Sequence, residues 1–229
     1  MDFIAHRGIP SIYPENTASS FTEALKYQPD QIECDIQCTK DGRFVVFHDF
    51  TVDRMTDGTG YVHEMTFEEI KALTVNGKER VLSLHDFLEM RPQGVMLNLE
   101  LKRLTEDKRA WEKELVKQVL AVRPRESVVF ASLNHTCLKR IGDIEGLQLA
   151  VAVEAELIGG ADYLLSLPFP LWAFHPSTDY LDRALFNVLH RHGIRVQAWC
   201  VDDATSLRRA EQAGVDAVMT NKLNKIKEG

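Results

Sequence analysis

The sequence has few of the residues that mark a zinc site or a disulfide framework. Its 229 residues include four scattered cysteines, Cys34, Cys38, Cys137 and Cys200, which do not form two closely spaced pairs. Cys34-x3-Cys38 could be half of a zinc site, but no partner pair follows it. Because there is also no secretory signal, we expect four reduced thiols and a cytoplasmic location.

Long hydrophobic runs and an excess of basic residues are also lacking. No stretch is apolar enough to cross a bilayer, which predicts a soluble protein without integral membrane association. The formal net charge is −7, whereas a nucleic-acid-binding protein normally carries a basic face. The composition, 45% hydrophobic and 27% charged, is typical of a globular enzyme. We therefore expect one domain over residues 1–229 with a small-molecule substrate and no nucleic-acid partner. The oligomeric state stays open.

Short apolar runs alternate with amphipathic stretches along nearly the whole chain. They predict strands at about 2–5, 31–36, 95–100, 127–132, 147–152, 171–174, 194–199 and 215–219. They predict helices near 16–27, 107–122, 134–142, 179–192 and 203–213. Eight strands in this alternation predict an α/β fold, a TIM (β/α)8 barrel. A doubly wound open sheet is the alternative, but no glycine-rich nucleotide loop supports it.

Residues 40–90 break this alternation. Lys40-Asp41-Gly42-Arg43 is a turn signal, and residues 44–48 read as a strand that returns antiparallel to 31–36. A turn centred on Asp41-Gly42 places His48 opposite Asp35, on the face that Asp35 shares with Glu33. A one-residue slip would undo this placement.

An insertion is predicted over residues 50–82, after the second barrel strand. It contains a short helix near 67–73 and is expected to cap the barrel mouth, where such enzymes build their sites. Phe67 and Ile70 give this helix a modest apolar face.

Three carboxylates point to a metal site. Glu33 and Asp35 are two positions apart on one strand, so both side chains project from the same face, and Glu100 follows on the next barrel strand. Buried like charges would repel unless a divalent cation removed the cost. A solvated rim or a salt bridge is the simpler reading of Glu33 and Asp35 alone, and Glu100 shifts the balance toward metal binding.

Two histidines lie beside these carboxylates in the predicted fold. His6 ends the first strand and is followed by Arg7, which can grip a phosphate, and Gly8, which lets the backbone approach a ligand. His48 precedes Asp49. A histidine titrates near neutral pH, so His6 and His48 are the candidates for moving protons.

Two helix starts lie close to these groups. Pro14-Glu15-Asn16-Thr17 begins a helix that Asn16 or Thr17 can cap, and Glu15 and Asn16 are also candidates for orienting the site. His85-Asp86 resembles His48-Asp49, but Ser83 fits a helix cap there, so no catalytic role is assigned.

These motifs carry a family resemblance. His6-Arg7-Gly8, Pro14-Glu15-Asn16-Thr17, Glu33-x-Asp35, His48-Asp49 and Glu100-x-Lys102 stand in the order found in glycerophosphodiester phosphodiesterases. The chain resembles this family from about residue 3 to residue 222, including the Trp199 region. The resemblance implies a TIM-type barrel with a small insertion after the second strand. It also implies metal-dependent hydrolysis of glycerophosphodiesters to sn-glycerol 3-phosphate and an alcohol.

The resemblance also implies roles for individual residues. Glu33, Asp35 and Glu100 match the metal ligands, for magnesium or calcium, with manganese as a further candidate. His6 and His48 match the catalytic acid and base, without saying which is which; His6 is weakly favoured as the acid. Arg7, Lys102 and Trp199 are the residues expected to bind phosphate or substrate. The nucleophile is either water or a glycerol hydroxyl that first forms a cyclic phosphate.

The sequence departs from the family's motifs at two places, and two alternative functions remain. Trp199-Cys200-Val201 stands where the family often has Trp-Thr-Val, and Val81-Leu82 where it often has Ile-Pro, which leaves the shape of the alcohol pocket open. One alternative is a phospholipase D-like enzyme acting on lysophospholipids or sphingolipids. The other is a barrel that binds a metal or phosphoester without turnover, although such a barrel would usually lack one of these groups.

Overall fold

Parallel strands close into a barrel in the computed structural model, which describes residues 1–90 and 94–228. β1 pairs with both β2 and β12, so the ring is complete. In order round the ring, the strands are β1 (Asp2–His6), β2 (Gln31–Cys38), β7 (Met96–Leu101), β8 (Val128–Ser132), β9 (Gln148–Val153), β10 (Ala173–Pro176), β11 (Arg195–Ala198) and β12 (Ala217–Thr220). The predicted TIM barrel is confirmed, and the open-sheet alternative is wrong.

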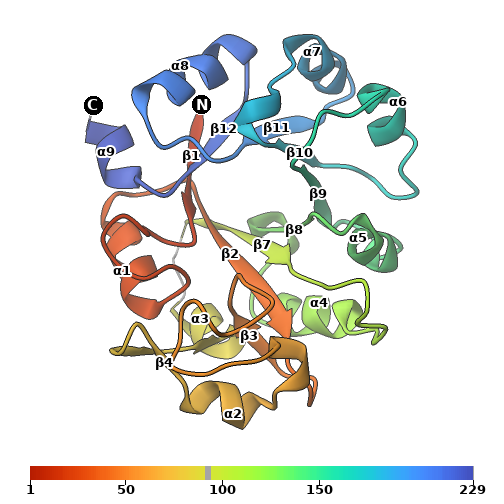
Figure 1. Ribbon diagram of the computed structural model, residues 1–229. Helices are drawn as coiled ribbons and strands as arrows, with labels where there is room; N and C mark the ends of the chain where they lie inside the picture. Colours follow the sequence, from red (N-terminus) through yellow and green to blue (C-terminus); the bar gives the residue numbers. More distant parts are fainter. Residues whose placement is uncertain (91–93, 229) are drawn as a thin grey trace.

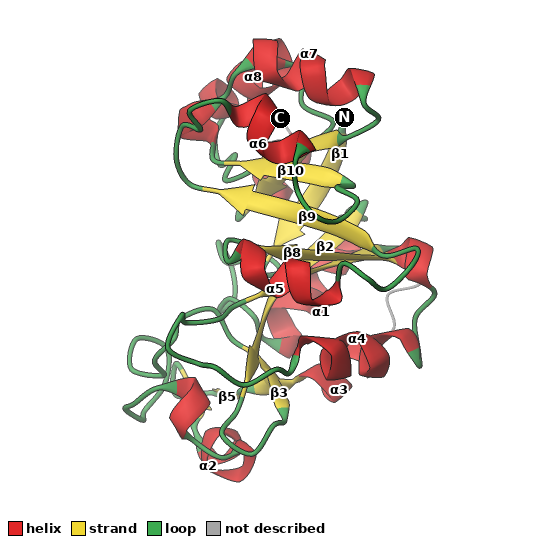
Figure 2. Cartoon of the chain, turned by 90° about the vertical axis from the view of Figure 1, so that its right-hand side faces the viewer, coloured by secondary structure: helices red, strands yellow, loops and turns green. Residues whose placement is uncertain are grey.

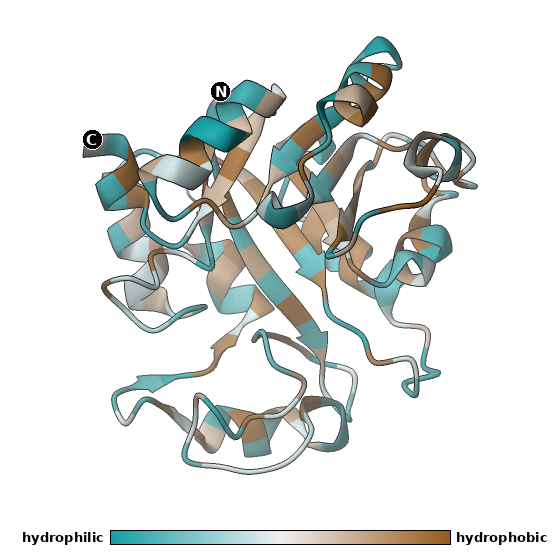
Figure 3. Ribbon diagram, turned by 45° about the horizontal axis from the view of Figure 1, so that its top comes forward, coloured by the Kyte–Doolittle hydropathy of each residue, from teal (hydrophilic) through white to brown (hydrophobic). Residues whose placement is uncertain are grey.

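Helices surround this barrel (Figure 1). They are α1 (Ala18–Lys26), α3 (Leu84–Glu89), α4 (Glu112–Leu120), α5 (His135–Ile141), α6 (Gly160–Leu165), α7 (Arg183–Arg191), α8 (Ala204–Ala213) and α9 (Leu223–Glu228), with short 3-10 turns at η2 (Arg125–Ser127) and η3 (Thr178–Tyr180). Outward residues of β2, such as Ile32 and Ile36, pack in the main core with helix residues such as Phe21 and Phe87. Hydrophobic and hydrophilic residues therefore alternate along β2 (Figure 3).

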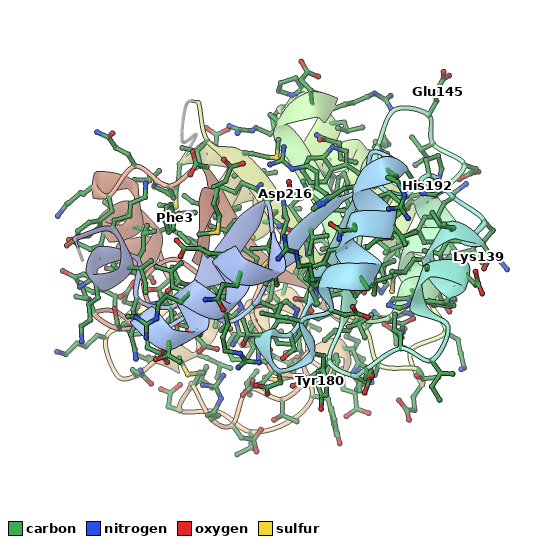
Figure 4. All side chains as sticks on the ribbon, turned by 90° about the horizontal axis from the view of Figure 1, so that it is seen from above. Phe3, Lys139, Glu145, Tyr180, His192 and Asp216 are labelled. Atoms are coloured by element: carbon green, nitrogen blue, oxygen red, sulfur yellow. The ribbon has the colours of Figure 1, made fainter. Side chains whose placement is uncertain are left out.

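The two ends of the barrel differ in what they can hold. Figure 4 labels Glu145, in the loop before β9, and Tyr180, in the loop after β10, on opposite sides of the molecule. The loops that follow the strands lie at the Tyr180 end. In TIM barrels this C-terminal end carries the functional site, while the other end serves stability.

The insertion forms a lobe beside the barrel (Figure 2), and this lobe has a hydrophobic core of its own. It holds β3 (Phe44–Val46), η1 (Val62–Glu64), α2 (Phe67–Ala72), β4 (Thr74–Val75), β5 (Glu79–Arg80) and β6 (Leu82–Ser83), with β3 pairing antiparallel to β2. Phe67 and Ile70 are buried in this core, 8% and 0% exposed. The modest apolar face predicted for this helix is therefore packed inside the lobe.

The register between β2 and β3 differs from the prediction by one residue. Ile36 pairs with Val46, and β3 ends there instead of continuing to residue 48. The cause is a three-residue loop: Thr39 N donates to Arg43 O, and Gly42 takes a left-handed φ of 80°. Such loops are a common hairpin form. The turn is therefore centred on residue 41.

Other predicted boundaries also differ from the observed ones, most of all at two helix starts. The helix predicted from 107 begins at Glu112, because residues before it form a loop in which Asp107 accepts hydrogen bonds from Arg109. The helix predicted from 179 begins at Arg183, where Asp182 caps it, after the short turn η3. The strand predicted at 171–174 is Ala173–Pro176.

Candidate active site

Three carboxylates converge inside the C-terminal end of the barrel. Glu33 and Asp35 lie on β2 and Glu100 on β7, and one oxygen of each lies within 4.8 Å of the others. The strand register pairs Asp35 directly with Glu100. Glu33 is 2% exposed and Asp35 is 0% exposed. The structure thus brings the three predicted ligands together, and their role in holding a metal stays a prediction.

Burial and neighbouring charges shift the pKa values of Glu33 and Asp35 in opposite directions. Burial raises the pKa of Glu33 well above its usual range, and the charges of Asp35 and Glu100 raise it further. Burial also acts to raise the pKa of Asp35, but the positive charges of Arg7 and Lys102 outweigh it, so this pKa is lowered. Among the described residues, Glu33 Oε1 and Asp35 Oδ1 are buried without a hydrogen-bond partner. Orphaned hard oxygens of this kind fit a Mg²⁺ or Ca²⁺ ion.

Two cations flank the carboxylates. Lys102 Nζ lies 3.0 Å from Glu100 Oε1 and 3.7 Å from Asp35 Oδ1. Arg7 Nε lies 3.2 Å from Asp35 Oδ2, and the backbone N of Arg7 donates to Glu33 Oε2 at 3.0 Å. Burial would lower the pKa of Lys102, but Glu100 and Asp35 raise it. Both cations stay charged beside the place where a phosphate would meet the carboxylates.

Gly8 packs closely against helix α1. A Cβ at this position would lie 2.4 Å from Ser20 Oγ and 2.7 Å from the backbone carbon of Ser20, and φ is +88°. The backbone of Gly8 therefore lies against helix α1, where a side chain would not fit.

His6 is held in one tautomer by a chain of hydrogen bonds. Its Nδ1 lies 2.9 Å from Asn221 Oδ1, and Asn221 Nδ2 donates to Asp202 Oδ2 at 2.7 Å. A carboxylate only accepts, so the amide nitrogen of Asn221 faces Asp202 and its oxygen faces His6. His6 Nδ1 therefore donates, and Nε2, which lies 3.8 Å from Glu33 Oε2, carries the lone pair. Burial, helped by the charge of Arg7, lowers the pKa of His6 to about 4.

His48 lies beyond the end of β3 and is set by a side chain of β2. Phe47 N donates to Asp35 O at 2.9 Å, and Gln37 Nε2 donates to Phe47 O at 2.9 Å and also to Asp49 O. His48 thus reaches the site through a turn that Gln37 holds, and not through the predicted strand register. Its Nδ1 lies 2.7 Å from Asp49 Oδ1, and its charge contributes to lowering the pKa of both Asp35 and His6.

Residues 15–17, directly before α1, each make a different contact. Thr17 Oγ1 caps the helix by accepting from Ser20 N. Asn16 has a left-handed φ of 59° and donates from Nδ2 to Asp35 Oδ2 at 2.8 Å. Glu15 Oε1 accepts from Arg7 Nη1 at 3.2 Å. Glu15 and Asn16 therefore touch the carboxylate cluster and its arginine, as two residues that orient the site would.

The remaining predicted residues lie round the same mouth. Trp199 follows β11, is partly buried, and donates from Nε1 to His175 O at 2.9 Å. A cavity of about 740 Å³ runs from Glu100 and Lys102 to Phe50 and the exposed Leu133. Another cavity of about 720 Å³, lined by residues of 94–96 and 121–127, lies where β7 and β8 begin, away from the carboxylates.

Asn221, Gln37 and Arg54 make contacts at the site but do not belong to the sequence motifs. Asn221 directly follows β12, and a polar residue at a strand end is a usable signal. Gln37 and Arg54 give no such signal, because their contacts depend on the hairpin and the insertion.

The cap predicted at Ser83 is confirmed: its side chain accepts from Asp86 N at 3.0 Å.

Carboxylates between two imidazoles, with cations beside them at the C-terminal end of a TIM barrel, define a barrel enzyme of the phosphodiesterase class. The profile of the glycerophosphoryl diester phosphodiesterase family matches residues 6–225. The chain belongs to this family, and the predicted enzyme class, hydrolysis of glycerophosphodiesters, is confirmed.

Individual relatives agree along the whole chain. A glycerophosphodiester phosphodiesterase of Caldanaerobacter subterraneus is 30% identical over 99% of this chain and 98% of its own. One of Bacillus altitudinis is 28% identical over 95% of this chain and 93% of its own. A solved phosphodiesterase of Oleispira antarctica, in complex with the product sn-glycerol-3-phosphate, matches with a TM-score of 0.90 and 26% identity, covering 100% of this chain and 96% of that one.

Proposed function

We propose that the chain releases sn-glycerol 3-phosphate and a small alcohol from glycerophosphodiesters, using a divalent cation held by Glu33, Asp35 and Glu100. The observation that carries this proposal is the set of orphaned buried carboxylate oxygens between two cations and two histidines. When bound, magnesium, calcium or manganese supplies positive charge that polarises the phosphate. Arg7 and Lys102 stabilise the charge that grows on the phosphate oxygens in the transition state.

We assign His6 as the base and His48 as the acid. Asn221 leaves the Nε2 lone pair of His6 free toward the carboxylates, and burial favours the neutral ring. Asp49 Oδ1 lies 2.7 Å from His48 Nδ1 and orients the ring, so that Nε2 can give a proton to the leaving alcohol. This assignment reverses the weak preference for His6 as the acid.

The cavity beside the carboxylates favours a second candidate substrate. It reaches from Glu100 past Phe50 to Leu133, which is 41% exposed, so it offers apolar surface to a long alcohol substituent. Lysophospholipids therefore stay a second candidate.

Within 1–90 and 94–228, no helix is long and apolar enough to cross a membrane. We also propose a cytoplasmic location, because the four cysteines are free thiols.

A substrate panel tests the proposal. Glycerophosphocholine, glycerophosphoethanolamine and lysophosphatidylcholine are incubated with the protein and a divalent metal, and the water-soluble products are separated. Release of glycerol 3-phosphate from the first two supports the proposal. Turnover of the lysolipid alone would favour the second candidate, and no turnover of any substrate would favour a non-catalytic binding barrel.

A further inference from the structure

The insertion sends one arginine into the ion-pair network at the barrel mouth. Arg54 stands two positions after Val52, which is fully buried in the core of the insertion. Its guanidinium side chain is 50% exposed. Arg54 Nε donates to Asp49 Oδ2 at 2.5 Å, and Nη2 donates to Asp49 Oδ1 at 2.9 Å. This is the forked contact that arginine makes with a carboxylate.

The same guanidinium also holds a second carboxylate. Arg54 Nη2 donates to Glu15 Oε1 at 2.7 Å, and that oxygen also accepts from Arg7 Nη1. Arg54 therefore joins the carboxylate beside His48 to the carboxylate beside Arg7. Its hydrogen bond is the main reason that the pKa of Asp49 falls to about 2, so this partner of His48 stays an anion.

This arrangement also accounts for a second cluster of potential metal ligands. Among the described residues, Glu15, His48 and Asp49 place one ligand atom each within 4.8 Å of the others. The guanidinium of Arg54 already contacts both carboxylates of this group. Arg54 supplies the positive charge that an ion would otherwise provide there.

We propose that Arg54 is a positioning residue, which fixes Asp49 so that His48 keeps Nδ1 toward that carboxylate and Nε2 toward the substrate. This inference rests on the proposed function for its effect on rate, but its effect on His48 is independent of any activity. The contact between Arg54 and Asp49 gives the insertion a part in the reaction beyond covering the barrel mouth.

The kinetic test compares Arg54→Ala with Arg43→Ala, a matched control in which an exposed arginine beside Phe67 is lost from the same lobe. With glycerophosphocholine and saturating metal, Arg54→Ala should lower kcat by about 10–100-fold, as removal of an outer partner typically does, while KM and metal affinity stay near wild type. Arg54→Lys should not restore kcat, because an ammonium cannot form the fork. Millimolar guanidinium should partly restore Arg54→Ala.

A double mutant separates positioning from direct contact with substrate. If Arg54 acts through Asp49, adding Arg54→Ala to Asp49→Asn should change kcat little beyond Asp49→Asn alone. An undiminished second loss, or a loss expressed in KM, would overturn the proposal.

The structural test needs no turnover. At a pH where the His48 ring is neutral, its nitrogen-15 signals should report Nδ1–H in the wild type and in Arg43→Ala, and a mixture of tautomers in Arg54→Ala. Unchanged signals in Arg54→Ala would overturn the proposal. If the wild type turns over no glycerophosphodiester, the proposed function fails, and this measurement still decides whether Arg54 positions His48.

Discussion

The ring nitrogen Nδ1 of His6 lies 2.9 Å from Oδ1 of Asn221, although 215 positions separate the two residues in the chain. β1 and β12 are neighbours in the barrel, so the closing of the ring brings their ends together. The contact decides which nitrogen of His6 faces the carboxylates. A residue that directly follows the last strand therefore sets the chemistry at the end of the first.

Asn221→Ala should lower kcat because His6 can then adopt either tautomer. The expected loss is about 10–100-fold, in the range seen when an outer partner of a functional group is removed. Steady-state kinetics should show little change in KM. Asn224→Ala is the control, since Asn224 lies one turn further on and its described contact is with Ser11. Equal kcat for wild type and Asn221→Ala would contradict the role of this contact.

His6→Ala and His48→Ala should each lower turnover by about 10²–10⁴-fold, the usual contribution of general acid–base catalysis. Thermal unfolding and metal binding should stay near wild type in both variants. His85→Ala, at an exposed histidine followed by the same Asp, is the control and should be fully active. A variant of His6 or His48 with near-normal kcat would remove that residue from the mechanism.

Glu33→Gln should weaken metal binding and stabilise the metal-free protein. Burial and the charges of Asp35 and Glu100 disfavour ionised Glu33, so a neutral amide removes a repulsion as well as a ligand. Calorimetry should show at least the roughly 10–100-fold loss of affinity that outer partners already cause. A gain of about 1 kcal/mol would raise Tm of the metal-free form by roughly 2–4 °C. Unchanged affinity would refute the ligand role.

Two substitutions of Asn16 separate the effect of backbone strain from the effect of its hydrogen bond to Asp35. Asn16→Gly keeps the left-handed φ without strain but removes the amide that donates to Asp35, whereas Asn16→Ala also strains the backbone. Both variants should lose metal affinity to a similar extent. Only Asn16→Ala should lose a further 1–2 kcal/mol or so of stability in denaturant unfolding. Normal metal affinity in Asn16→Gly would show that the amide does not support Asp35.

The sequence predicts the parts of this protein that depend on local pattern. The buried strands, the alternation along β2 and the shared face of Glu33 and Asp35 follow from the period of two. The predicted position of His48 depends on an assumed turn. The observed register between β2 and β3 differs from it by one residue, because Gly42 closes a three-residue loop. The contacts of Gln37, Arg54 and Asn221 join segments whose relative placement only the folded chain determines.

We propose that the carboxylate cluster makes hydrolysis depend on a divalent metal. The most direct test is release of glycerol 3-phosphate from glycerophosphocholine by the wild type and by Asp35→Asn, first in EDTA and then with magnesium, calcium or manganese restored. We expect no release in EDTA, recovery by the wild type with at least one metal, and little recovery by Asp35→Asn. Undiminished release by the wild type in EDTA, or equal recovery by Asp35→Asn, would contradict this proposal.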